Sequence, residues 1–164
     1  MGNAILDYLA GAIELDALSD AEKCAVCAAM EGEWVGHPIM LSAIGCWEYV
    51  RLSVTDKGAR IYSQPTDYLS DGTAALRLVE RFGLVHGRMR SEWYCAGNIG
   101  GTYIGHIDHD GVTWLRISND DGSWYKPDFW AHADTPAAAI VSAVCALARE
   151  QYPYKVETLT GGTK

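Results

Sequence analysis

The chain has 164 residues, of which 49% are hydrophobic and 21% are charged. This size and composition fit one globular domain that buries roughly two thirds of its unfolded surface, without a metal or disulfide to hold it. Thirteen Lys and Arg stand against 21 Asp and Glu, and the net charge of −8 opposes attraction to nucleic acid. Direct DNA binding is therefore not expected, and a basic partner is favoured. The scattered acidic residues are typical of a solvated surface, with a phosphate-mimicking face as the alternative.

The cysteines and the chain start bear on the compartment. The five cysteines are an odd number, and no basic, apolar leader with a cleavage site opens the chain. The longest apolar stretch, 136–148, is shorter than the about 20 residues that a membrane helix needs. We therefore expect a cytoplasmic protein with reduced thiols and no membrane contact.

The first third of the chain predicts helices and then strands. Hydrophobic residues repeat at helical spacing at Ile5, Leu9 and Ile13. Ser19 and Glu22 have the spacing of a capping box, which predicts a second helix to about Met30 that stops at Gly32. The segment 31–64 then carries short strand signals with a turn at 56–58. We expect this segment to be an insertion or a strand-rich arm.

The third predicted helix lies near residues 71–82. Ser70 or Asp71 supplies its N-cap, and Gly83 stands where a helix commonly ends. Its expected apolar stripe consists of Leu76, Val79 and Phe82.

A run of strands follows that helix. The expected strands are 89–96, 102–107, 112–118 and 123–132. Asp-Gly pairs at 110–111 and 121–122 predict hairpin turns, so we expect a β-meander of antiparallel strands. Pro127 lacks a backbone donor, and the last strand should therefore be an edge strand or be broken there.

The third of these strands carries large apolar residues on both faces. Trp114 lies on one face and Leu115 on the other, because successive strand residues point to opposite sides. An alanine-rich helix is expected from Pro136 to about Gln151, with Ile140 on its apolar stripe. Helices on both faces of a mainly antiparallel sheet give an α+β fold, a three-layer α/β/α sandwich.

The sequence also predicts where the folded domain ends. No internal repeat or linker divides it, so we expect a single globular domain over 1–154. The glycine- and threonine-rich end, 155–164, is expected to be a disordered tail.

Three segments together resemble the phage ABA-sandwich family, a group of small proteins encoded by bacteriophages and prophages. The segments are 14–18, 68–80 and 131–140. The resemblance extends over 14–152, with 31–64 as its main departure. It implies the same three-layer architecture. The shared motifs are caps, turns and helix faces, so no catalytic residue carries over.

Metal chemistry is the first alternative to a structural role for the polar residues. His106 and Asp108 alternate along one strand, and His132 repeats a His-x-Asp pattern at another. Turn and helix-cap chemistry explain these patterns without a metal. A zinc site from Cys24, Cys27, His37 and Cys46 is disfavoured, because the first two cysteines fall within a predicted helix. No cofactor is expected.

Aromatic residues suggest a binding surface beside Pro127. Most should be core residues, but the surplus forms a candidate docking strip of Trp124, Tyr125, Phe129 and Trp130. Arginines that could meet the phosphates of a small nucleotide ligand are Arg88, Arg90 and Arg116.

Three functions are compatible with these observations. The first is a non-enzymatic phage accessory protein in the bacterial cytoplasm that binds a host or phage protein and inhibits an antiviral defence, with a second copy as another partner for the strip. The second is a binder of a nucleotide signal. The least favoured is a metal-dependent hydrolase. No nucleophile elbow or phosphate-binding loop supports an enzyme.

Overall fold

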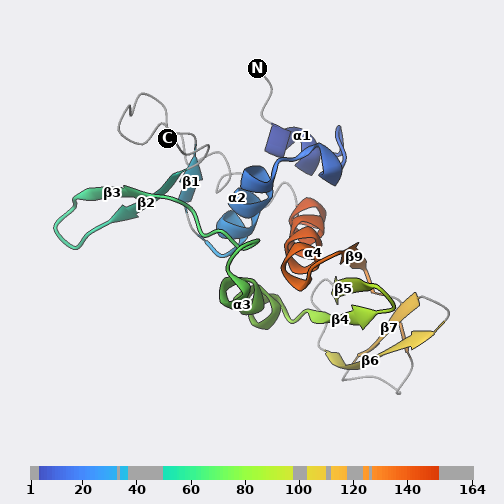
Figure 1. Cartoon of the computed structure of the whole chain (residues 1–164). Coiled ribbons are helices and arrows are strands. Elements are labelled where there is room, and N and C mark those ends of the chain that lie inside the picture. Colours follow the sequence, from blue (N-terminus) through green and yellow to red (C-terminus); the bar gives the residue numbers. More distant parts are fainter. Residues whose placement is uncertain are drawn as a thin grey trace. The chain divides into compact units, whose positions relative to one another are not determined.

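The computed structural model describes residues 4–32, 34–36, 50–97, 103–109, 112–117, 124–125 and 127–151. The description excludes the side chains at 34–36, 50, 52, 62, 89, 103–109, 112–117 and 124–125. The fold mixes helices and strands and is of the α+β type (Figure 1). Its helical segments are α1 Ala4–Leu9, η1 Leu15–Ala17, α2 Asp20–Met30, α3 Gly72–Phe82 and α4 Pro136–Glu150. Its strands are β1 Trp34–Gly36, β2 Val50–Val54, β3 Arg60–Ser63, β4 Val85–Met89, β5 Glu92–Gly97, β6 Tyr103–His109, β7 Val112–Ile117, β8 Trp124–Tyr125 and β9 Phe129–Ala133.

The chain divides into two compact units. One consists of Met1–Tyr68 and Ala148–Lys164, and the other of Leu69–Leu147. The single domain over 1–154 stays a prediction, and the expected tail at 155–164 lies outside the described residues. No helix in the described part of the chain is long and apolar enough to cross a membrane.

Helix α2 of the first unit begins where local hydrogen bonds cap it. The Ser19 amide donates to Glu22 Oε2 over 2.7 Å, and the Glu22 amide donates to Ser19 Oγ over 3.2 Å, which confirms the capping box. Helix α2 ends at Met30 as predicted, and every residue in 24–30 is buried. Helix α1 is shorter than the hydrophobic spacing indicated, since it stops before Ile13.

The first unit also contains an antiparallel sheet in the order β1-β2-β3. Its β2 and β3 form a hairpin in which Val54 pairs with Arg60. The turn closes through a 2.9 Å bond from the Thr55 amide to the Ala59 carbonyl, and Gly58 adopts φ +79. The predicted turn at 56–58 is therefore confirmed, because a left-handed residue is needed there and glycine supplies it without a Cβ clash.

The second unit opens with α3, whose predicted cap is confirmed. Asp71 Oδ1 accepts hydrogen bonds from the amides of Thr73 and Ala74 over 3.0 and 3.1 Å. Its predicted apolar stripe was wrong at Leu76, which is 50% exposed. The buried face instead consists of Ala74, Ala75 and Leu78. Small alanines allow close approach of a neighbouring element, and the spacing of large apolar residues alone does not reveal this.

Strand pairing in the second unit differs from a simple meander. One sheet has the order β4-β5-β9 and another the order β6-β7-β8, both antiparallel. Strand β9 thus pairs with β5, although β6, β7 and β8 lie between them in the sequence. The prediction of one meander was wrong, because short hairpin signals indicate neighbouring pairs and carry no information on which distant strand joins a sheet.

Two local predictions for this unit are confirmed. The last expected strand is broken at Pro127, since β8 ends at Tyr125 and β9 begins at Phe129. Helix α4 begins at Pro136, where Thr135 Oγ1 accepts a 3.2 Å bond from the Ala138 amide. The buried residues of α4 include the predicted stripe of Ile140, Val144 and Leu147. The three-layer arrangement itself stays a prediction.

Candidate binding surface

The candidate docking strip contains one buried and one exposed residue among its described side chains. Phe129 is 5% exposed, whereas Trp130 is 45% exposed. This difference follows from strand geometry, because adjacent residues of β9 point to opposite faces of the sheet. Trp124 and Tyr125 lie on β8, where only the backbone is described. Phe129 is therefore a core residue, and the prediction that its side chain forms part of an exposed rim was wrong.

Phe129 is held in the core by a glycine on the neighbouring strand. Gly97 pairs with Phe129, and a Cβ placed at Gly97 would overlap the Phe129 ring. The same Cβ would also lie 2.8 Å from Leu84 Cδ2. The missing side chain thus leaves the space that the phenyl ring occupies, so that Phe129 and Leu84 pack closely around this end of β5.

Trp130 shares its face of the sheet with His132 and the buried Tyr94. Trp130 pairs with Ala96, and His132 pairs with Tyr94. The Tyr94 ring lies over Gly87 of β4, with its Oη 2.9 Å from where a Cβ would stand. Strand β4 borders β5 on the side away from β9, and the missing side chain of Gly87 leaves room there for the Tyr94 ring. Trp130, by contrast, is an exposed large hydrophobic residue on the same face.

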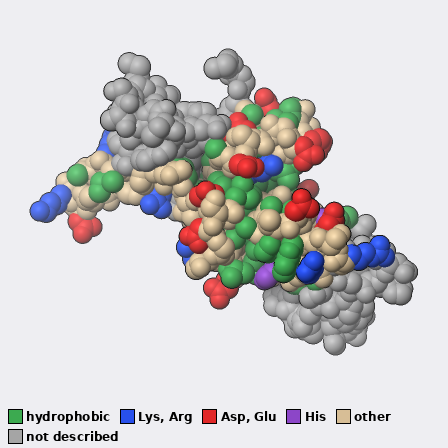
Figure 2. All heavy atoms as spheres, viewed as in Figure 1, with side chains coloured by type: hydrophobic (Ala, Val, Ile, Leu, Met, Phe, Trp, Pro, Cys, Tyr) green, Lys and Arg blue, Asp and Glu red, His purple; other side chains and the backbone are tan. Residues whose placement is uncertain are grey.

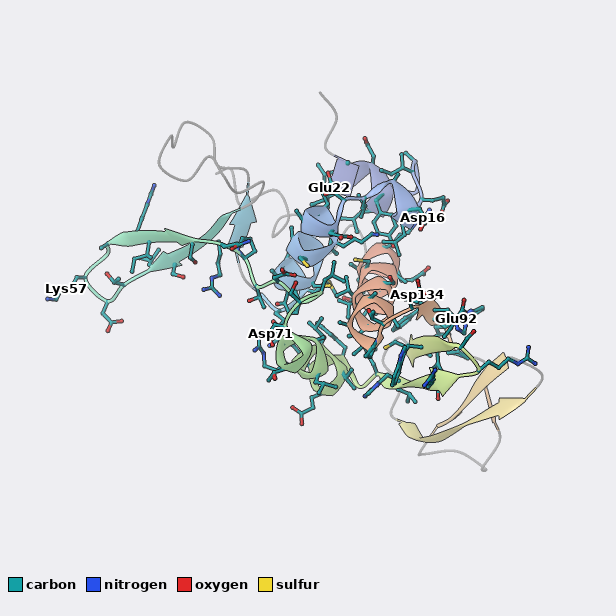
Figure 3. The ribbon with its side chains drawn as sticks, viewed as in Figure 1. Asp16, Glu22, Lys57, Asp71, Glu92 and Asp134 are labelled. Carbon is teal, nitrogen blue, oxygen red and sulfur yellow. The ribbon has the colours of Figure 1, made fainter. Side chains whose placement is uncertain are left out.

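Acidic groups border this face. His132 Nδ1 lies 4.0 Å from Glu92 Oε2, and the two side chains are 29% and 57% exposed. Asp134 follows β9 at the same end of the sheet, because Trp93 pairs with Ala133 (Figure 3). We call Trp130, His132, Glu92 and Asp134 the β9 surface. It combines one exposed aromatic with two carboxylates and a histidine.

The three arginines of the nucleotide hypothesis lie on two different sheets. Arg88 is exposed on β4, and Arg90 is exposed in the two-residue turn that joins β4 to β5. Arg90 has φ +56, which non-glycine residues rarely adopt. Arg116 lies on β7, where its side chain is not described. Arg88 pairs with Trp93, whose side chain points to the face opposite Trp130.

The candidate metal ligands also lie on two different sheets. His106 and Asp108 alternate on β6, where the description is limited to the backbone, and His132 lies on β9 beside Glu92. Among the described side chains, no group of three or more His, Cys, Asp or Glu could hold a metal ion. Because the side chains of His106 and Asp108 are outside the description, this candidate site stays a prediction.

Four of the cysteines are buried, and none of these four forms a disulfide. They are Cys24, Cys27, Cys95 and Cys145. Cys24 Sγ lies 3.8 Å from Asp67 Oδ1. His37 and Cys46, the other candidate zinc ligands, lie outside the described residues. Burial raises the pKa of Cys95 to about 12, although a hydrogen bond with the Ala96 backbone acts in the opposite direction. A thiol of this kind is a packing group rather than a nucleophile.

Sequence reasoning missed one exposed region. Val54 is 63% exposed and Ile61 is 50% exposed, both on the hairpin of β2 and β3. The available signal was the turn at 56–58 flanked by short strands. Comparisons with family models, with curated proteins and with solved structures give no significant match to this chain.

Proposed function

We propose that this protein is a non-enzymatic binding protein that docks another protein on its β9 surface. The observation that carries the proposal is Trp130, which is 45% exposed on β9 while its neighbour Phe129 is buried. A large aromatic that the fold leaves on the surface is the kind of residue that anchors protein interfaces. The β9 strand stands at the end of its sheet among the described strands, where a partner has access.

The partner surface should be basic around an apolar pocket. Glu92 and Asp134 border Trp130 and His132, and the whole chain has a net charge of −8. Electrostatic complementarity of this kind speeds association and excludes acidic partners. A pocket for the indole with Lys or Arg at its rim would satisfy both features of the β9 surface.

The biological setting belongs to the same proposal. The resemblance of 14–18, 68–80 and 131–140 to the phage ABA-sandwich family supports a phage-encoded protein in a bacterial cell. It also supports the three-layer α/β/α arrangement. In that setting, the partner is a host or phage protein, and inhibition of an antiviral defence is the outcome of binding that we propose.

A matched pair of substitutions on β9 tests the proposal. Trp130→Ala should abolish capture of the partner from a bacterial host lysate while the melting temperature stays near that of the wild type, since an exposed side chain contributes little to the core. Phe129→Ala is the control and should lower the free energy of unfolding by about 3–5 kcal/mol. The captured protein is identified by mass spectrometry, and its affinity for each variant is then measured by calorimetry.

Two results would contradict the proposal. One is a partner that binds the wild type and Trp130→Ala with equal affinity. The other is a loss of stability in Trp130→Ala as large as that in Phe129→Ala, because the indole would then belong to the core.

A nucleotide-signal binder remains the second candidate because Arg88 and Arg90 are both exposed on one hairpin. Two guanidinium groups this close in the chain can bind neighbouring phosphates. Native mass spectrometry of protein purified from phage-infected cells should then show a bound small molecule that is lost in Arg88→Ala/Arg90→Ala. An unliganded mass for the wild type would exclude this candidate.

A further inference from the structure

The hairpin of β2 and β3 is exposed on both faces at its tip. Val54 is 63% exposed, and it shares a face with its pairing partner Arg60. Ile61 is 50% exposed, and it lies with Ser53 on the opposite face. Because neighbouring strand residues point to opposite sides, exposure of both faces means that the described part of the chain covers neither. Figure 1 shows the hairpin reaching away from α1 and α2 of the same unit.

The hairpin is basic although the chain is acidic. Within 50–63, the basic residues are Arg51, Lys57 and Arg60, and Asp56 is the one acidic residue. The hairpin therefore has a net charge of +2. Arg51 Nε donates a 3.2 Å hydrogen bond to Ser63 Oγ, which holds it along the sheet. Lys57 and Arg60 are exposed near the tip.

The helical segment of the same unit carries the opposite charge. Within 4–32, the acidic residues are Asp7, Glu14, Asp16, Asp20, Glu22 and Glu31, and Lys23 is the one basic residue. This segment therefore has a net charge of −5. Figure 2 shows acidic side chains gathered over the helices, and Figure 3 places Lys57 at the tip of the hairpin, far from Asp16 and Glu22. The hairpin of one chain is thus directed away from its own acidic segment.

We propose that the hairpin docks on the acidic helical segment of a second copy of this chain. Each copy carries one +2 hairpin and one −5 segment in the same unit, so two copies related by a two-fold axis can satisfy both contacts at once. The exposed Val54 provides apolar contact on the face that it shares with Arg60. A nucleic acid fits this surface less well, because it would also meet the acidic residues of a chain with net charge −8.

A charge-swap experiment with the full chain tests the dimer. Variant one is Lys57→Glu/Arg60→Glu, and variant two is Asp7→Lys/Asp16→Lys. The two aspartates are exposed and, unlike Ser19 and Glu22, take no part in the α2 cap. Masses are measured by light scattering and sedimentation at low and high salt, and melting temperatures confirm that each variant is folded.

The wild type should be a dimer at 50 mM salt and should dissociate as salt rises, because exposed charge pairs are screened. Variant one alone should be monomeric, because its hairpin of net charge −2 repels the −5 segment. Variant two should have its dimer dissociation constant raised at least about tenfold, because its segment is reduced to −1 and every substitution acts twice in a two-fold dimer. An equimolar mixture of the two variants should form a heterodimer, because one of its contacts is the wild-type pairing of a +2 hairpin with a −5 segment. In the other contact, the −2 hairpin of variant one meets a segment of variant two that is reduced to −1, which repels it far less than the −5 segment of variant one does.

A monomeric wild type at 50 mM salt and roughly 100 μM protein would overturn this inference. Its dimer dissociation constant would then exceed roughly 100 μM, which is too weak for a specific dimer. Failure of the mixed variants to pair would also overturn it. Trp130→Ala is the control, and it should dimerise as the wild type does. The experiments can therefore refute the dimer proposal without refuting partner binding on the β9 surface, and the reverse.

Discussion

At the scale of single residues, Cys95 shows how burial changes chemistry. Its side chain is fully buried on β5, and burial raises its pKa from 9.0 to about 12. The cause is desolvation, which penalises the thiolate more than the neutral thiol. In the unfolded chain, the same thiol would ionise near pH 9. Protonation of Cys95 is therefore linked to folding.

This linkage predicts a loss of stability in alkaline solution. Between pH 9 and about 12, the unfolded state loses the Cys95 proton while the folded state keeps it, so the free energy of unfolding falls as pH rises. The fall attributable to Cys95 should approach about 1.4 kcal/mol per pH unit. Urea unfolding of the wild type and of Cys95→Ala across this range measures it. Parallel pH profiles for the two proteins would refute the assignment.

At the scale of elements, side-chain caps account for where α2, α3 and α4 begin. Asp71 stands at the start of α3 and accepts bonds from two backbone amides that have no partner within the helix (Figure 3). At the other end, Gly83 adopts φ +60 and its amide bonds back to Glu80. Both ends of α3 are thus specified by residues within a few positions of the helix.

Removing the N-cap should weaken α3 by a predictable amount. Asp71→Ala should lower the free energy of unfolding by about 1 kcal/mol, because the amides of Thr73 and Ala74 lose their acceptor. Asp71→Asn keeps an acceptor oxygen and should cost far less. Chemical denaturation followed by circular dichroism compares the three proteins. Equal stability of Asp71→Ala and the wild type would show that solvent satisfies these amides equally well.

At the scale of the whole molecule, α4 contributes to both compact units. Residues 136–147 belong to one unit and Ala148–Glu150 to the other. Arg149 binds the start of the chain, with its Nη1 3.3 Å from Glu14 Oε2 and its guanidinium 5.2 Å from the Tyr8 ring centre. A single helix therefore carries residues needed by both units.

The continuity of α4 predicts that the two units unfold together. Hydrogen exchange read by mass spectrometry should show protection of α2 and of β5 disappearing at the same denaturant concentration, as a cooperative two-state transition requires. Arg149→Ala should increase exchange in α1 while leaving β5 unaffected under native conditions. Separate transitions for α2 and β5 would mean that the units are independent domains, which would contradict the predicted single domain over 1–154.

Predictions of the candidate binding surface succeeded only in part, for a physical reason. The break at Pro127 follows from its missing N–H, and the cluster of aromatics beside it is visible in the sequence. Whether Phe129 or Trp130 faces the core depends on Gly97 and Leu84, which lie some 30 and 45 residues away. Alternation shows that the two side chains point apart, but it does not indicate which of them is covered.

Several local features follow from the sequence alone: the caps of α2 and α3, the turn at 56–58, the start of α4 and the break before β9. In each of these, the interacting groups lie within about four residues, so local chemistry is sufficient. Three other features required the three-dimensional arrangement of the chain: the pairing of β9 with β5, the exposure of Leu76 and the burial of Phe129. These outcomes depend on contacts between segments that are distant in the sequence. The free energy of burial in such contacts outweighs local conformational propensity, and no fixed spacing of residues predicts them.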